Sequence, residues 1–195
     1  MKILAFVDLH GNIALLKRIV VESKNYELVV CAGDISNFEH NLSTLLAMLA
    51  KATPPVLIIP GNHETPEALQ EACSKHPKLL FLHRGLYKAK GISFVGYGTG
   101  GFSIVDKGFE GFAERVKPHL SGKVVLITHA PPHKTKLDIV LGEHRGSKSI
   151  RKFITSVKPV LAICGHFHET EGQEDYIGRT RIVNPGKRGK LLVIQ

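Results

Sequence analysis

Short apolar segments alternate with helical patterns over the first 73 residues, and this alternation constrains the fold more than any other feature. The apolar runs are typical of buried strands and cover residues 2–8, 26–34 and 55–64. The segments with helical spacing cover residues 13–23, 41–51 and 65–73. Asn12 and Thr65 stand where N-caps are expected, and Pro66 suits a first helical position. Such a series predicts an α/β protein with a mainly parallel sheet.

The pattern changes after this series. Three short runs separated by glycine-containing turns predict strands of a second sheet, at residues 79–84, 85–90 and 91–98. Further strands are predicted at residues 123–130, 158–166, 174–186 and 190–195, and helices at 109–120 and 149–157. Residues 130–147 form a long loop, which is often functional in a compact domain. Without repeats or linkers, the chain is expected to form a single domain over residues 1–195.

Composition narrows the class of protein. The formal net charge of +9 suits an anionic partner such as a phosphate ester or nucleic acid, although the scattered basic residues favour an ordinary solvated surface. Three cysteines without CxxC spacing predict buried free thiols rather than disulfides or thiolate metal ligands. The apolar runs are short, and the first runs directly into Asp8, so we expect neither a signal peptide nor a membrane partner, and a cytoplasmic location.

Polar residues that bind metals follow five of the predicted strands. They are Asp8 and His10, Asp34, Asn62 and His63, His129, and His166 and His168. Because ligands bind at the carboxyl ends of strands in open α/β sheets, these residues can converge. Within each pair spaced i, i+2, both side chains point to the same side of an extended segment.

The number of possible ligands predicts two metal ions. Two carboxylates, one amide and even four of the five imidazoles are too many for one ion, whereas a shared carboxylate can bridge two. Mixed nitrogen and oxygen ligands favour Mn, with Fe, Zn, Ni or Co as alternatives, over Ca or Mg. His133 and His144, on the long loop, are candidates to support the site or contact substrate. Four further histidines are expected to have ordinary roles, namely His40, His76, His83 and His119.

Together these motifs resemble the calcineurin-like metallophosphoesterase superfamily. The pattern DxH, GD, GNH, a histidine in "THAPP", and GHxH runs from Asp8 to His168 in the family's order. The ending "NPG" at residues 184–186 is similar to small prokaryotic members. The resemblance implies a four-layer α/β/β/α sandwich, with two facing mixed sheets flanked by helices.

The resemblance also implies roles for the residues. One metal would be held by Asp8, His10 and His168, the other by Asn62, His129 and His166, with Asp34 bridging them. A hydroxide activated by both ions would attack phosphorus, and His63 would act as general acid toward the leaving group. The expected substrate is a small phosphate ester, with diesters favoured over monoesters. "GDISNFEH" lacks the "DRG" tail of protein phosphatases, which argues against phosphoprotein substrates.

Two other functions stay open. A nuclease is compatible with the net charge, but few aromatic residues are available to stack bases, so a nucleic-acid partner is not favoured. A non-catalytic scaffold would be expected to lack the acid or part of the ligand set, and both are intact here. Arg84, Arg145 and Lys187 could bind a phosphate, although an ordinary surface charge is favoured for each. The sequence leaves the native metal and the oligomeric state open.

Overall fold

The predicted strands of the first third of the chain lie side by side in the first sheet of the computed structural model, which describes residues 1–100 and 103–195. In spatial order its strands are β13 (Lys190–Val193), β1 (Lys2–Phe6), β2 (Leu28–Cys31), β3 (Val56–Ile58) and β4 (Leu79–Phe81). β1 to β4 are parallel, and β13 pairs antiparallel with β1. The carboxyl ends of β1, β2 and β3 therefore meet at one edge of the sheet.

The second sheet is also mixed. In spatial order its strands are β11 (Glu174–Ile177), β12 (Thr180–Val183), β10 (Leu161–Ile163), β7 (Lys123–Thr128), β6 (Ile92–Tyr97) and β5 (Gly85–Ala89). The four inner strands are parallel, and the two outer strands pair antiparallel with their neighbours. Parallel pairing of β7 and β10 brings the segments that follow them, with His129 and His166, to the same edge.

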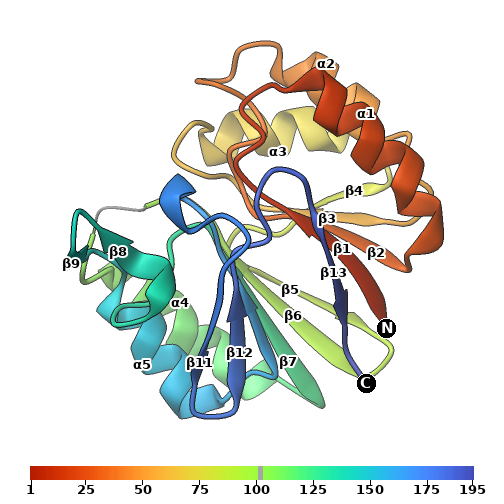
Figure 1. Ribbon diagram of the computed structural model, residues 1–195. Coiled ribbons are helices and arrows are strands. Elements are labelled where there is room, and N and C mark those ends of the chain that lie inside the picture. Colours follow the sequence, from red (N-terminus) through yellow and green to blue (C-terminus); the bar gives the residue numbers. More distant parts are fainter. Residues whose placement is uncertain (101–102) are drawn as a thin grey trace.

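Helices cover the outer face of each sheet (Figure 1). The first sheet is covered by α1 (Ile13–Glu22), α2 (Leu42–Leu49) and α3 (Pro66–Ser74), and the second by α4 (Lys107–Val116) and α5 (Lys148–Val157). The predicted caps are confirmed, since Asn12 accepts a hydrogen bond from the Leu15 amide and Thr65 from the Ala68 amide. Within the described residues the longest helices have 10 residues, too few to cross a bilayer.

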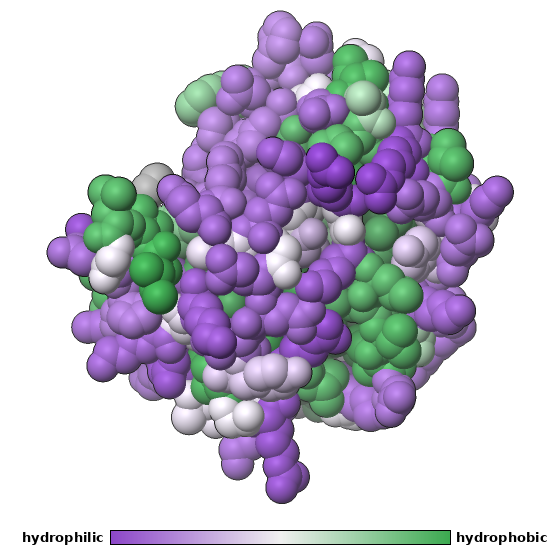
Figure 2. All heavy atoms as spheres, viewed as in Figure 1, coloured by the Kyte–Doolittle hydropathy of each residue, from purple (hydrophilic) through white to green (hydrophobic). Residues whose placement is uncertain are grey.

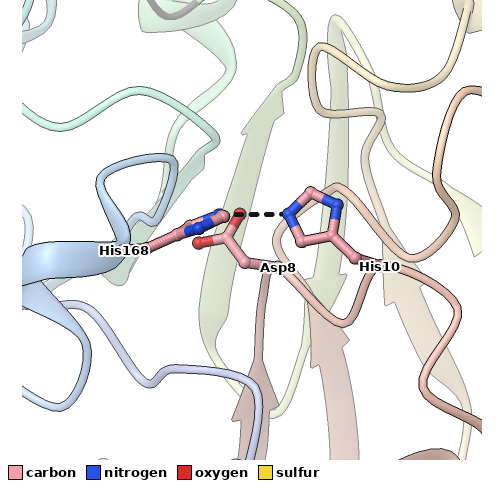
Figure 3. Close-up of side chains that lie close together, drawn as sticks. All are labelled: Asp8, His10 and His168. Carbon is pink, nitrogen blue, oxygen red and sulfur yellow. Dashed lines mark hydrogen bonds between the residues drawn. The ribbon is translucent and has the colours of Figure 1, made fainter.

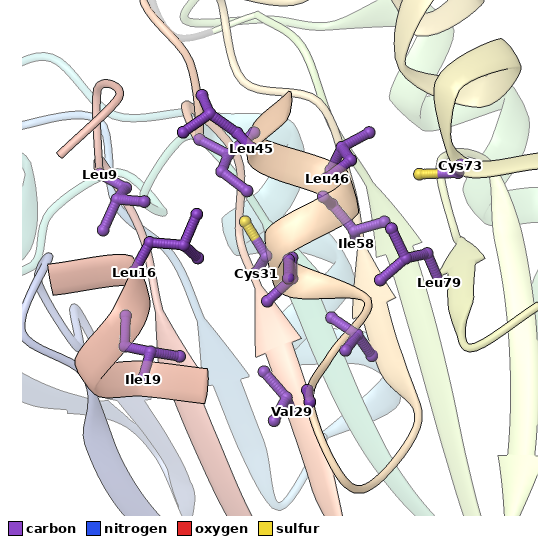
Figure 4. Packing of buried hydrophobic residues seen from close by; sticks show 14 of the residues in the cluster. Leu9, Leu16, Ile19, Val29, Cys31, Leu45, Leu46, Ile58, Cys73 and Leu79 are labelled. Atoms are coloured by element: carbon purple, nitrogen blue, oxygen red, sulfur yellow. The ribbon is translucent and has the colours of Figure 1, made fainter. Parts of the chain in front are cut away.

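In the part of the chain that the structure describes, three apolar clusters hold the four layers together. One lies between α1–α3 and the first sheet and includes Leu16, Cys31 and Ile58 (Figure 4). The second, which includes Phe94, lies between the sheets, and the third, which includes Phe153, joins the second sheet to α4 and α5. The predicted sandwich is confirmed, and all three cysteines are buried free thiols as expected.

Two predictions about strands were wrong. Residues 79–81 belong to the first sheet, because α3 returns the chain parallel to β3; the chain changes sheet only after Leu82, whose amide donates to the Ile58 carbonyl. Residues 174–186 form not one strand but the hairpin β11–β12, which turns at Gly178 with a φ of 59°.

The remaining elements are short. Among the described residues, four 3-10 helices cover Ser23–Asn25, Lys117–His119, Lys136–Asp138 and His168–Thr170. The predicted long loop 130–147 contains the third of these and a two-stranded ribbon, β8 (Ile139–Val140) and β9 (Glu143–His144). The predicted helix 109–120 begins earlier, at Lys107, because Asp106 caps it.

Candidate metal centre

The polar ends of five strands converge where the edges of the two sheets meet. The Asp34 carboxylate is central: its Oδ2 lies 3.3 Å from His129 Nε2, 3.8 Å from His10 Nε2 and 3.9 Å from His63 Nε2. Three overlapping groups of side chains place their ligand atoms within 4.8 Å of one another; they are Asp8 with His10 and His168, His10 with Asp34 and His63, and Asp8 with Asp34 and His129.

Asp8, His10 and His168 form one side of this cluster (Figure 3). His10 and His168 come from segments 158 residues apart, yet their Nε2 atoms are 3.0 Å apart. Asp8 lies two residues after the end of β1 and is buried. The DxH and GHxH motifs therefore meet in space, as their positions at strand ends predict.

Asn62, His129 and His166 form the other side. Asn62 Oδ1 lies 3.0 Å from His129 Nε2 and 2.9 Å from His166 Nδ1. The backbone amide of His166 donates to Asp8 Oδ2 at 3.0 Å, which joins the two sides. The structure thus brings together all eight residues that the sequence singles out.

The backbone around the site adopts conformations that are costly for most residues. Asp8, His10, Asp34 and His166 have positive φ values of 54°, 47°, 52° and 73°. Such left-handed residues cluster at functional sites, where the surrounding structure holds them in place. Gly61 is required for a related reason, since a Cβ at this position would lie 1.9 Å from Asp34 Oδ1.

Buried charge shifts the pKa values of several of these groups. Burial disfavours ionised Asp34, but the hydrogen bonds and charges of His129 and His63 outweigh it and lower its pKa to about 2. Burial raises the pKa of Asp8, and the nearby Asp34 carboxylate adds to this rise. Burial likewise lowers the pKa of His166 to about 4, so its ring is neutral near pH 7. The cluster therefore combines crowded carboxylates with a neutral imidazole at His166.

The donor set fits divalent cations. His129 Nδ1 faces the Ala32 carbonyl at 3.0 Å and can donate to it, so a neutral ring directs its Nε2 lone pair toward Asn62 Oδ1 and Asp34 Oδ2. These three acceptor atoms face one another, so a proton or a cation must lie between them. Without a cation the proton is on His129: the hydrogen bond and charge of Asp34 outweigh the effect of burial and raise the pKa of His129 to about 9. Asp8 Oδ1 is buried without a hydrogen-bond partner among the described residues, as expected for a ligand atom.

Glu64 is a supporting residue that the sequence analysis missed. This carboxylate is 4% exposed and accepts hydrogen bonds from the amides of Asp34, Ser36 and Gly61 and from the Ser36 hydroxyl. It therefore fastens the GD loop to the GNH loop. The signal was its position directly after "GNH", but a glutamate at a strand end is ordinarily an exposed residue.

The three candidate phosphate-binding cations have different environments. Lys187 lines a cavity of about 280 Å³ beside Asp8, His10 and His168, and its Nζ lies 3.7 Å from Glu171. Arg84 instead lies over the Tyr97 ring, and Arg145 pairs with Glu143 on the ribbon. Only Lys187, of these three, lies beside the cluster.

His133 and His144 lie outside the cluster and face Asp138. His144 Nδ1 is 2.7 Å from Asp138 Oδ1, and His133 Nδ1 is 3.5 Å from Oδ2. Asp138 also accepts from backbone amides of its own loop, so the two histidines help to fix that loop.

The face in Figure 2 shows apolar side chains gathered over β8–β9, where Ile139 and Leu141 are exposed. The remaining four histidines, His40, His76, His83 and His119, belong to none of the three candidate metal-binding groups found among the described residues.

An α/β/β/α sandwich with carboxylates and imidazoles at the joined edges of its sheets defines a class of metal-dependent hydrolases. The chain belongs to the calcineurin-like phosphoesterase family, whose sequence model matches residues 1–170. The uncharacterized protein MJ1162 of Methanocaldococcus jannaschii is 36% identical over 203 residues, covering 96% of this chain and 89% of the relative.

Solved structures share the fold at lower identity. The protein TT1561 of Thermus thermophilus is similar with a TM-score of 0.81 and 15% identity, covering 97% of both chains. A structure described as a novel archaeal phosphodiesterase has a TM-score of 0.58 and 14% identity, covering 100% of both chains. The family membership makes a phosphate ester the expected kind of substrate.

Proposed function

We propose that this protein is a metal-dependent phosphodiesterase that acts on small phosphate esters. It uses two bound divalent ions, for which Mn²⁺ is the leading candidate. The observation that carries the proposal is the overlap of the three groups, in which Asp8 and Asp34 each belong to two. Shared carboxylates are typical of paired metal sites. We further propose that residues 1–195 act as one domain.

In this proposal the residues on the two sides of the cluster hold one ion each. Asp8, His10 and His168 hold the first, Asn62, His129 and His166 hold the second, and Asp34 lies between them. When bound, such ions supply Lewis-acid activation of water and offset the charge on the phosphoryl oxygens. Glu64 keeps Asp34 in place through the amide hydrogen bonds of its loop.

His63 provides the proton for the leaving group. Its backbone amide donates to Asp34 Oδ1 at 2.9 Å, and its ring centroid lies 4.7 Å from that of His10, so it borders the cluster. A protonated imidazole here can donate to the departing alkoxide. His63 also belongs to one group of possible ligands, so acid and ligand roles need separate measurements.

The charge near the cluster supports a diester rather than a monoester substrate. Apart from histidines, Lys187 is the one cationic side chain among the described residues that line the cavity, and Glu171 offsets part of its charge. A monoester dianion carries more charge to neutralise than a diester monoanion. The archaeal phosphodiesterase of similar fold agrees with this preference.

The acid role of His63 is tested with diesters whose leaving groups differ in acidity. His63→Ala should reduce kcat by about 10²–10⁴-fold for a phenyl diester and by less for a p-nitrophenyl diester, which needs little protonation. Metal content should stay at two ions per chain. The exposed, distant His119 provides the control His119→Ala, with unchanged kinetics. Equal losses with both leaving groups, or loss of an ion, would refute the acid role.

A further inference from the structure

Phe38 is an exposed aromatic side chain that lies against the proposed acid. It is in the loop between β2 and α2, at the carboxyl edge of the first sheet (Figure 1). The residue is 75% exposed, and its ring centroid lies 4.1 Å from that of His63 with an interplanar angle of 43°. One side of the ring therefore contacts His63, while most of its surface faces solvent.

The loop holds Phe38 in this place at a conformational cost. Phe38, Glu39 and Asn41 have positive φ values of 49°, 61° and 55°, which are unfavourable for residues with a Cβ. The Glu39 amide donates to the His63 carbonyl at 3.1 Å, and Glu39 Oε1 accepts from the amide and hydroxyl of Thr65, each at 2.7 Å. The loop is thus fastened by hydrogen bonds to the segment that carries His63.

Packing does not explain the position of Phe38. The ring belongs to none of the hydrophobic clusters formed by the described residues. A large aromatic ring stabilises a fold mainly through the apolar surface that it buries, and an exposed ring contributes little in this way. Strained residues cluster at active sites and ligand clamps, so an exposed aromatic ring held beside the proposed acid favours contact with a bound substrate.

We propose that Phe38 is the platform on which a planar, apolar leaving group of the phosphodiester stacks. This inference rests on the proposed function, since a leaving-group oxygen within reach of His63 places the rest of that group beside the Phe38 ring. Aromatic groups stack on exposed rings in offset or tilted arrangements. The substrate class is therefore an aryl ester or an ester of a base-bearing alcohol, rather than one with a small aliphatic leaving group.

The test compares two methyl diesters on the metal-loaded protein. Methyl phenyl phosphate has a planar leaving group, and methyl hexafluoroisopropyl phosphate has a compact, non-planar one of comparable acidity. Phe38→Ala should lower kcat/KM for the phenyl ester about tenfold, mainly through KM, because stacking on one aromatic residue typically contributes this much. The change should stay below about twofold for the fluoroalkyl ester. Phe38→Tyr should restore wild-type values with both.

Tyr176→Ala is the matched control, because Tyr176 is also an exposed aromatic, 60% accessible, on β11. Equal losses with both esters would overturn the platform and assign Phe38 to positioning His63. No loss with either would overturn the platform while leaving the proposed function intact. Wild-type protein that cleaves neither ester would refute the proposed function and, with it, the platform.

Discussion

Replacing Glu64 should destabilise the protein, although none of the proposed metal ligands is itself replaced. The carboxylate is buried and accepts four hydrogen bonds, two at each oxygen: Ser36 amide and hydroxyl at Oε1, Asp34 and Gly61 amides at Oε2. In Glu64→Gln the amide nitrogen can face Ser36, whose hydroxyl can turn and accept. The Ser36 amide is then left without an acceptor.

One buried, unsatisfied amide costs about 1–3 kcal/mol, so Glu64→Gln should lower the free energy of unfolding by that amount. For a chain of this length the melting temperature falls by about 2–12 °C. Glu64→Ala leaves three amides unsatisfied and should cost more than about 3 kcal/mol. Urea titration of metal-free protein measures these changes. The control is Glu71→Gln, because the Glu71 side chain is 77% exposed, and its free energy of unfolding should stay within about 0.5 kcal/mol of wild type. A Glu64→Gln protein as stable as this control would refute the reasoning.

Three further predictions concern other parts of the molecule. Asn184→Ala should lower the free energy of unfolding by about 1–3 kcal/mol in urea titrations. The buried Asn184 side chain donates to Thr170 Oγ1 at 3.1 Å and accepts from the Gly186 amide, and both hydrogen bonds are lost in the variant. Unchanged stability would contradict this prediction. Hydrogen bonds from Arg181 lower the pKa of Glu174 from 4.5 to about 2, so this carboxylate contributes stability above pH 4.5 that is lost as the pH falls through 2, and Glu174→Gln should flatten this part of an acid-denaturation curve. Chelation should lower the melting temperature, and Mn²⁺ at about 100 times its Kd should restore about 2.7 kcal/mol per site, whereas a melting temperature indifferent to Mn²⁺ would count against the metal sites.

The site residues could be found from the sequence because their positions follow directly from strand periodicity. An apolar strand such as β1 or β2 points its carboxyl end to a known edge, so Asp8 and Asp34 had to meet there. The histidines of "CGHFH" follow β10 in the second sheet, whereas Asp8 follows β1 in the first. They can meet only if the two sheets face each other, and this arrangement was predicted from the family resemblance and not from strand periodicity.

Features that depend on long-range packing could not be read in this way. The composition of the apolar run at β4 would suit a strand of either sheet. The run joins the first sheet because α3 returns the chain parallel to β3. Glu64 looks like a surface residue until three loop amides point at it. Phe38 looks like a core residue, and only the left-handed loop shows that it faces solvent.

Metal-dependent cleavage of phosphodiesters by this protein can be measured with two chromogenic esters. Chelator-treated protein is assayed with bis-p-nitrophenyl phosphate and p-nitrophenyl phosphate, before and after addition of Mn²⁺. We expect turnover only with metal, faster for the diester, and abolished by Asp34→Asn, which changes the carboxylate shared by two ligand groups. Protein that binds Mn²⁺ but hydrolyses neither ester would refute the proposed activity.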